Sequence, residues 1–245
     1  MKVIIPAKTN SSRTLDKNWR KFHGNKCLVE IKVEQLIDAG LNPEDIYVFC
    51  EDKRHEKKVT FLGAKFVLRR PETTADAMHW SDVIVELVSH LQCSDSESVA
   101  WVHACTPLFD APDFQAVIHM WETKQGPIWD QGKYDSLITV KPLKEFVIDE
   151  NGKPMNFSYG RWHEWSQDLP QWFVMDFPIH IMSKGTYLRH SYFVGSKPYL
   201  YVVRSPSIDI DTPEEFQLAQ EIYAARHPLK PVVRQVPSKT TDDLP

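Results

Sequence analysis

The chain has 245 residues, a formal net charge of -4, 42% hydrophobic residues and 25% charged residues, a balance typical of one soluble globular domain. It holds nine glycines and neither a G-x-x-x-x-G-K-S/T nor a G-x-G-x-x-G pattern, which excludes the P-loop and the dinucleotide-binding loop. No basic run and no long apolar stretch is present, so we expect no nucleic-acid partner, no membrane partner and a cytosolic protein.

Strand-like and helix-like patterns alternate through the first half of the chain. Short runs rich in β-branched and aromatic residues predict strands at 3–5, 46–50, 65–68 and 99–102. Apolar residues at helical spacing predict helices at 28–37 and 78–91, and a third helix begins near Asp110. This alternation predicts an α/β fold with parallel strands and crossover helices.

Ligands of such sheets bind beyond the carboxyl ends of the strands. The segments that follow the predicted strands are therefore the candidates for a binding site. They are residues 7–25, the residues from Glu51 onward, and residues 69–79 and 103–110.

The pattern changes after a predicted strand at 137–140. Within 141–175, Asn151-Gly152 predicts a hairpin, and three indoles, Trp162, Trp165 and Trp172, gather with other aromatic rings. Because aromatic residues dominate both cores and interfaces, this segment is either an inserted subdomain or a subunit contact.

The predicted main domain covers residues 1–227 and ends with a well-marked helix. Two more strands are predicted at 179–182 and 199–203. Thr212-Pro213-Glu214-Glu215 then provides a capping residue, a proline in the first turn and a glutamate three residues after the cap. Residues 228–245 hold four prolines and little apolar content, which predicts a disordered tail.

Two aspartates stand just before that helix. Asp209 and Asp211 alternate on an extended segment, so both carboxylates point to one side. Two such oxygens can hold Mg²⁺ and leave its other positions for phosphate and water. The alternative is an ordinary loop in which the helix dipole favours the aspartates.

A polar stretch follows the first predicted strand. Lys8, Arg13 and Lys17 supply positive charge, and Asn10 and Ser11 supply amide and hydroxyl groups. Side chains of these kinds could bind a polyanion without a glycine loop. A solvated surface loop has the same composition, and His103, at the end of another strand, could bind substrate or merely cap the strand.

Several motifs resemble one known family. They occur in the same order as in the acylneuraminate cytidylyltransferases, also called CMP-sialic acid synthetases, and the resemblance runs from Lys2 to Tyr223. The motifs are IIPA, K-x-N-S, Lys17-Asn18, RRPETTAD, HACTPLF, LPQWF and SIDIDTPEEFQLAQ.

The resemblance implies a fold and a reaction. The fold would be a Rossmann-like α/β nucleotidyltransferase sheet with crossover helices, and the small inserted subdomain at 141–175 would form a homodimer. The reaction would join CTP to a small acidic acceptor, a nonulosonic-acid-like sugar, with Mg²⁺ as cofactor, and would release pyrophosphate.

The same resemblance assigns the nucleotide side of a site. Asp209 and Asp211 match the metal-binding aspartates, Lys8 stands in place of a triphosphate-binding arginine, and Ser11 matches a phosphate-loop serine. His79-Trp80 replace a helix-start serine near the cytosine. The catalytic candidates are Lys8, Lys17 and Asp211, and the nucleotide-binding candidates are Lys8, Asn10, Ser11, Arg13, Lys17, Asn18, His79 and Trp80.

The acceptor side departs from the family. The family's Gln-Pro-Thr-Ser segment corresponds here to the segment with His103, Cys105 and Thr106, and Lys144 matches a substrate-side lysine. The family's Arg-Pro-Asn-Gly motif is replaced by Val-Met-Asp-Phe at residues 174–177. An arginine that faces the sugar carboxylate is replaced by Ser166, so Trp162, Trp165, His163 and Arg161 are candidates for a different pocket. The substrate-binding candidates are His103, Thr106, Lys144, Arg161, Gln167 and Asp176.

Four functions fit these observations. The first is the cytidylyltransferase for an acidic sugar, and the second is a cytidylyltransferase for a phosphonate or phosphorylated acceptor. A glycosyltransferase that uses a nucleotide sugar also combines Asp-x-Asp with a metal, although its motif ordinarily ends a middle strand. The last is a non-catalytic protein that binds a nucleotide or a sugar.

Overall fold

The computed structural model describes residues 1–9, 14–74, 78–123 and 134–229. In this part of the chain a seven-stranded sheet has the order β5-β4-β1-β6-β8-β7-β9, beside a two-stranded sheet of β2 and β3. The strands are β1 (Lys2–Pro6), β2 (Lys21–His23), β3 (Lys26–Cys27), β4 (Ile46–Cys50), β5 (Lys65–Leu68), β6 (Ser98–Val102), β7 (Ser136–Leu143), β8 (Trp172–Ser183) and β9 (Pro198–Val202).

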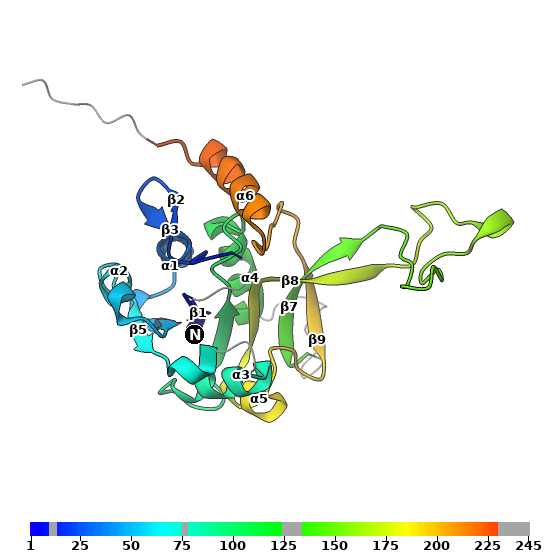
Figure 1. Ribbon diagram of the computed structural model, residues 1–245. Coiled ribbons are helices and arrows are strands. Elements are labelled where there is room, and N and C mark those ends of the chain that lie inside the picture. Colours follow the sequence, from blue (N-terminus) through cyan, green and yellow to red (C-terminus); the bar gives the residue numbers. More distant parts are fainter. Residues whose placement is uncertain (10–13, 75–77, 124–133, 230–245) are drawn as a thin grey trace, which may run out of the picture.

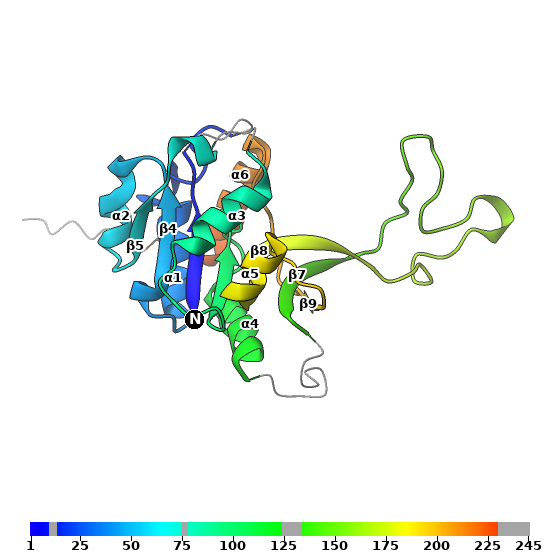
Figure 2. The same ribbon diagram turned by 90° about the horizontal axis from the view of Figure 1, so that it is seen from below.

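Helices cover both faces of the large sheet (Figures 1 and 2). Helices α1, α4 and α6 pack on the face that receives Val3 and Ile5 of β1. Helices α3 and α5 pack on the other face, which receives Ile4, because neighbouring residues of a strand point to opposite sides. The helices are α1 (Leu28–Asp38), α2 (Glu56–Thr60), α3 (Trp80–Ser89), α4 (Ala111–Thr123), α5 (Lys184–His190) and α6 (Pro213–Arg226), with short 3₁₀ helices η1 (Pro43–Asp45), η2 (Lys53–His55), η3 (Pro71–Thr74) and η4 (Gly160–Trp162).

The predicted α/β fold is confirmed, with one strand reversed. β1, β4, β5 and β6 pair in parallel, as predicted, and β7 pairs in parallel with β9. β8 is antiparallel to both of its neighbours, β6 and β7. The alternating pattern predicted parallel strands for the first half of the chain and gave no direction for β8; β7 and β8 follow one another as a long hairpin rather than across a helix.

A bulge interrupts the pairing of β7 with β8. Ile138 pairs with His180, whereas Val140 pairs with Met175, so four residues of β8 lie opposite Thr139. A bulge of this kind bends a strand and redirects its side chains. Residues 176–179 are therefore free of the regular pairing with β7 just where the hairpin leaves the sheet, although Ile179 still pairs with Val102 of β6.

Beyond the bulge, β7 and β8 extend into an arm that projects from the body (Figures 1 and 2). We use the word arm for residues 144–171. Its turn at Asn151-Gly152 confirms the hairpin prediction: Gly152 has a φ of +77°, and Ile148 bridges to Pro154. Trp162 and Trp165 are 77% and 73% exposed, so the predicted inserted subdomain is an elongated arm rather than a compact unit.

Helix α6 begins with the predicted capping box. The Glu215 amide donates to Thr212 Oγ1 at 3.2 Å, and the Thr212 amide donates to Glu215 Oε2 at 2.9 Å. The predicted tail falls almost wholly outside the described residues. Among the helices that the structure describes, none is both long and apolar enough to span a bilayer.

Candidate active site

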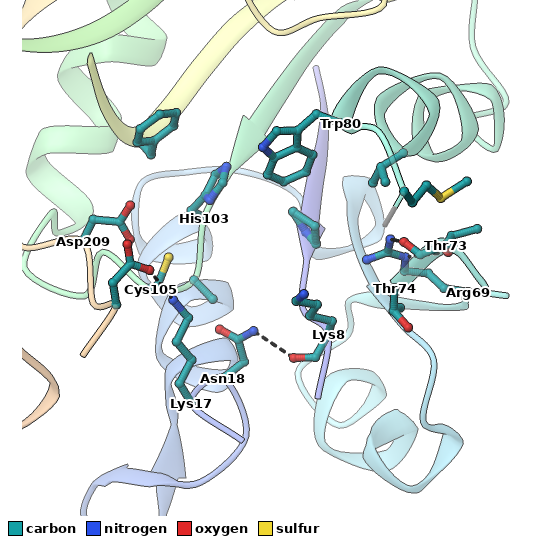
Figure 3. A pocket seen from close by; sticks show the side chains of 16 residues that line it. Lys8, Lys17, Asn18, Arg69, Thr73, Thr74, Trp80, His103, Cys105 and Asp209 are labelled. Carbon is teal, nitrogen blue, oxygen red and sulfur yellow. Dashed lines mark hydrogen bonds and ion pairs between the residues drawn. The ribbon is translucent and has the colours of Figure 1, made fainter. Parts of the chain in front are cut away.

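One cavity of about 520 Å³ lies at the carboxyl ends of β1, β5 and β6, where the sequence predicted a binding site. The segments that follow these strands contribute Lys8, Arg69 and His103, and the segment before α6 contributes Asp209 (Figure 3). The same segment also contributes Asp211. The described lining is Pro6, Lys8, Lys17, Asn18, Arg69, Thr73, Thr74, Met78, Trp80, Val83, His103, Ala104, Cys105, Phe177, Asp209 and Asp211.

Asp209 and Asp211 form an acidic end of this cavity. Lys17 Nζ lies 3.1 Å from Asp211 Oδ1 and also donates to the Ile210 carbonyl. The Ile210 amide donates to the Cys105 carbonyl at 2.9 Å, and Thr14 Oγ1 donates to the Asp211 carbonyl at 2.8 Å. Backbone and side-chain contacts thus hold the Asp-x-Asp segment against the segments that follow β6 and β1.

One carboxylate oxygen of Asp209, Oδ1, is buried without a hydrogen-bond partner among the described residues. Burial raises the pKa of Asp209, while the Cys105 thiol and the Lys17 ammonium lower it. Burial also raises the pKa of Cys105 well above its usual value, so the thiol stays protonated and can donate to Asp209.

These two carboxylates suit a hard divalent cation. A buried carboxylate oxygen without a partner is costly, and a cation would offset that cost. The described residues include no cluster of three or more His, Cys, Asp or Glu side chains that could hold a metal. A cation held by Asp209 and Asp211 would therefore take further ligands from phosphate and water, as Mg²⁺ does.

The segment after β1 brings positive charge to the cavity floor. Asn18 Nδ2 donates to the Lys8 carbonyl at 3.1 Å. Glu51, after β4, accepts hydrogen bonds from the Thr9 amide at 2.8 Å and from Thr9 Oγ1 at 2.5 Å. Lys8, Lys17 and Asn18 thus meet as predicted, whereas the candidates Asn10, Ser11 and Arg13 lie outside the described residues.

The polar end opposite the aspartates was not predicted. Arg69 is only 5% exposed; its Nε donates to Thr73 Oγ1 at 3.2 Å, and its Nη2 donates to the Thr73 carbonyl. Burial lowers the pKa of Arg69, but an arginine remains a cation. The motif RRPETTAD follows a predicted strand, and that position was the available indication that Arg69, Thr73 and Thr74 border the site.

An aromatic wall joins the two ends. The ring centroid of His103 lies 6.3 Å from that of Trp80 and 5.5 Å from that of Phe177. Burial lowers the pKa of His103 to about 3. Of the predicted pair His79-Trp80, only Trp80 is in the described lining, because His79 precedes the first turn of α3 and is exposed.

Most predicted acceptor residues do not line this cavity. Thr106 is fully buried, and its hydroxyl donates to the His103 carbonyl at 3.0 Å. Asp176 is 2% exposed and pairs with Lys141. Lys144, Arg161 and Gln167 are exposed on the arm, which points away from the body that contains the cavity (Figure 1).

Comparison with known proteins gives consistent matches. A family model described as Cytidylyltransferase matches residues 2–154. An N-acylneuraminate cytidylyltransferase of Streptococcus agalactiae serotype III is 24% identical over 227 residues, which cover 87% of this chain and 51% of that protein. The chain thus spans about half the length of that relative.

A second relative and two solved structures match over nearly their whole length. The 8-amino-3,8-dideoxy-manno-octulosonate cytidylyltransferase of Shewanella baltica is 25% identical over 250 residues, with coverage of 91% and 98%. A CMP:2-keto-3-deoxy-manno-octonic acid synthetase complexed with CTP has a TM-score of 0.62 at 16% identity and coverage of 92% and 98%. A 4-diphosphocytidyl-2C-methyl-D-erythritol synthase from Anaerococcus prevotii has a TM-score of 0.58 at 13% identity and coverage of 91% and 98%. At these identities the structures support the fold alone.

Proposed function

Since the chain belongs to the cytidylyltransferase family, we propose that it transfers CMP from CTP to an acidic sugar and releases pyrophosphate. The observation that carries the proposal is the contact of Lys17 with Asp211 beside the unpartnered Asp209 oxygen. A cation-binding pair and a phosphate-binding lysine meet there in one cavity. Nucleotidyl transfer requires that combination, because charge develops on both the attacked and the departing phosphates.

In the proposed reaction the lysines and the aspartates of the cavity have different roles. An acceptor oxygen forms a bond to the α-phosphorus of CTP, and the bond from that phosphorus to the bridging oxygen of pyrophosphate breaks. Lys8 and Lys17 would stabilise the negative charge of the departing pyrophosphate. Asp209 and Asp211 would hold Mg²⁺, which supplies charge neutralisation at the phosphates when bound.

His103 is a poor candidate for the base that takes a proton from the acceptor. With a pKa of about 3, its imidazole binds a proton too weakly to act at neutral pH. Two sources remain for the acceptor's negative charge: contact with the cation, which acidifies a hydroxyl, or an acceptor group that is already ionised. We therefore assign His103 a binding role.

The polar end of the cavity suits a nucleobase. Trp80 is 48% exposed and borders the cavity together with Arg69 and Thr74. An indole supplies a flat apolar surface, and the arginine and threonine supply hydrogen-bond donors. We place the base of CTP there, with its phosphates directed toward Lys8 and Lys17.

The names of two relatives indicate the class of acceptor that we propose. The two curated relatives are named for N-acylneuraminate and for 8-amino-3,8-dideoxy-manno-octulosonate, both acidic sugars of eight or more carbons. We propose an acceptor of this class. The three candidates Lys144, Arg161 and Gln167 could reach it only from the arm of a second copy.

That geometry is our reason to propose a homodimer. An apolar groove of about 430 Å³ lies at the base of the arm and includes Val140, Trp172 and Leu200. Together with the exposed Trp162 and Trp165, it gives the arm region an apolar surface suited to a second subunit. Light scattering that finds a monomer at micromolar concentration would contradict this part of the proposal.

Pyrophosphate release tests the activity directly. The protein is incubated with CTP, Mg²⁺ and a panel of acidic sugars, phosphonates and phosphorylated alcohols. We expect pyrophosphate with an acidic sugar and at least about a hundredfold slower release in Asp211→Asn, because half of the cation site loses its charge. Asp38→Asn, an exposed carboxylate at the end of α1, is the matched control and should keep the wild-type rate.

Each alternative has its own outcome in this assay. Release with phosphonates alone would change the acceptor class. Hydrolysis of a nucleotide sugar without pyrophosphate would favour a glycosyltransferase. CTP binding without turnover on any acceptor would favour a non-catalytic homologue, and wild-type turnover by Asp211→Asn would refute the metal assignment.

A further inference from the structure

An ion pair between a half-exposed lysine and a buried aspartate joins the two strands at the base of the arm. Lys141 Nζ on β7 lies 3.1 Å from Asp176 Oδ1 on β8. The Asp176 backbone is fixed as well, because its carbonyl accepts hydrogen bonds from Thr139 Oγ1 at 2.7 Å and from His180 Nε2 at 3.0 Å. Asp176 is only 2% exposed, so the bulge of β8 holds a carboxylate that depends on Lys141 for its counter-charge.

The same pair reaches the segment that carries the two site aspartates. Lys141 Nζ donates to the Ser207 carbonyl at 2.8 Å, and Ser207 Oγ donates to Asp176 Oδ1 at 3.3 Å. Ser207 stands two residues before Asp209, in a stretch between β9 and α6 without regular secondary structure. Side chains from both strands of the arm's base therefore fix this stretch.

Asp176 is close enough to Asp209 to affect it. Its negative charge acts on Asp209 at a distance, since Asp176 is not in the described lining of the cavity. Lys141 Nζ, 3.1 Å from Asp176 Oδ1, offsets that charge. The network thus acts on Asp209 both by holding its backbone and by balancing a neighbouring carboxylate.

We infer that Lys141, Asp176 and Ser207 are positioning residues, which set the affinity of the two site aspartates for a divalent cation. This inference rests on the proposed function, in which Asp209 and Asp211 hold that cation. The three positioning residues do not touch the cation. They keep the segment 203–209 in the geometry that places Asp209 in the cavity. Because Lys141 and Asp176 stand where the arm leaves the sheet, this geometry also depends on the arm's base.

Hydrogen exchange of the ligand-free protein tests the anchor without any activity. In Lys141→Met we expect the backbone amides of 203–209 to exchange about tenfold faster, because a partly buried charged hydrogen bond to this segment is lost. Lys153→Met removes an exposed arm lysine and should leave those amides unchanged. Equal exchange in Lys141→Met and wild type would overturn the inference.

Mn²⁺ binding, measured by electron paramagnetic resonance, tests the consequence. If Lys141 acted only through its charge, its removal would tighten Mn²⁺ binding by leaving more net negative charge beside Asp209. Positioning predicts the opposite sign, a dissociation constant about tenfold higher in Lys141→Met. Asp176→Asn keeps acceptors for Lys141 and Ser207 and should stay within about threefold of wild type.

The outcomes separate this inference from the proposed function. Tighter or unchanged Mn²⁺ binding in Lys141→Met would overturn the inference, whatever the enzyme's turnover. Wild-type protein that binds no Mn²⁺, with or without CTP, would contradict the cation site of the proposed function and, with it, any effect on cation affinity. If Lys141→Met folds poorly, Ser207→Ala, which removes one side-chain contact, should show the same two effects at smaller size.

Discussion

His103 shows how the surroundings of a residue fix its chemical form. The Trp101 indole can only donate, and its Nε1 lies 2.9 Å from His103 Nε2, so Nε2 is the acceptor and the proton of the neutral ring is on Nδ1. Burial, then the nearby His180 and Lys17, lower the pKa of His103 to about 3. The ring therefore keeps the same hydrogen-bond donor and acceptor over the whole physiological pH range.

His103 should therefore keep one protonation state around neutral pH. We expect the ring carbon proton of His103, observed by nuclear magnetic resonance, to show no titration between pH 5 and pH 8, because its pKa lies below that interval. The spectrum of His103→Gln identifies the resonance by its absence. A midpoint near the ordinary histidine value of about 6.5 would show that the ring is hydrated and able to exchange protons.

Lys32 is a second residue whose burial has a measurable effect. Its Nζ is fully buried, donates to the carbonyls of Thr106 and Phe109 at 2.9 Å and 3.2 Å, and lies 4.6 Å from the Phe114 ring centroid. It thereby holds the loop that carries His103 and Cys105. Burial lowers the pKa of Lys32 from 10.5 to about 7.

The sign of the pH dependence follows from proton binding. Between about pH 7 and 10.5 the unfolded chain holds more protons at this site than the folded protein, so stability rises with pH across that interval. In Lys32→Met we expect this rise in the free energy of unfolding to shrink, by up to about 3 kcal/mol between pH 7 and pH 9.5. Urea denaturation at both pH values measures it, and Lys153→Met should retain the wild-type slope.

The sequence located four charged residues of the site from local patterns, but not Phe177. Lys8, Lys17, Asp209 and Asp211 follow predicted strands or precede a capped helix, and such positions can be found from local patterns. Phe177 reaches the cavity from a bulge, and a bulge depends on how two distant strands pair. Local periodicity therefore could not indicate it.

At the scale of elements, the start of α6 joins helix stability to the site. Besides its bonds to Thr212, Glu215 Oε2 accepts a hydrogen bond from the Asp211 amide at 2.8 Å. The capping box thus also holds the backbone of a proposed cation ligand. The predicted cap was correct because the four residues that form it are contiguous in the sequence.

Thr212→Ala should lower the free energy of unfolding by about 1 kcal/mol, the usual effect of losing a capping oxygen. Thr212→Ser keeps that oxygen and should remain within a few tenths of a kcal/mol of wild type. Urea denaturation compares the three proteins. Equal stability of the alanine variant would show that the capping bond contributes nothing in solution.

The arm is the element that the sequence described least well. Its aromatic composition suited a compact insert and an exposed arm equally, because both uses favour large apolar side chains. The direction of β8 was not predicted for a related reason: alternation along one strand indicates its buried face but not the direction of its neighbour.

Because Leu143 and Trp172 pair at the base of the arm, a tight Asn-Gly turn can replace residues 144–171. We expect the shortened protein to keep the thermal shift caused by CTP and Mg²⁺, since the described cavity lining includes no arm residue. It should behave as a monomer in light scattering. A shortened dimer would place the subunit contact elsewhere, and loss of the thermal shift would show that the arm contributes to nucleotide binding.

On the scale of the whole molecule, the sheet gathers residues that are far apart in the chain. The cavity combines segments that follow three parallel strands with one that precedes the last helix. The rule that ligands bind at the carboxyl ends of parallel strands therefore predicts the position of this cavity from the sequence alone. The sequence could not indicate which of the four segments face one another, because that depends on the strand order β5-β4-β1-β6-β8.

A ligand that bridges these segments should stabilise the whole fold. In the presence of Mg²⁺ we expect CTP at a hundred times its dissociation constant to add about 2.7 kcal/mol to the free energy of unfolding. ATP, GTP and UTP should add less if the polar end of the cavity selects cytosine. Thermal denaturation with each nucleotide compares them, and equal shifts would show that this end binds bases without selection.

The position of β8 has a consequence for how the chain reaches its native state. β8 lies between β6 and β7, and its Ser183 pairs with Ser98, so α4, β7 and the whole arm are synthesised before that edge of β6 is paired. Contacts between residues so far apart in sequence form slowly, and an unpaired strand edge can associate with other chains. That edge of β6 therefore stays unpaired until the arm and β8 have left the ribosome. This strand order thus exposes the chain to aggregation during its synthesis.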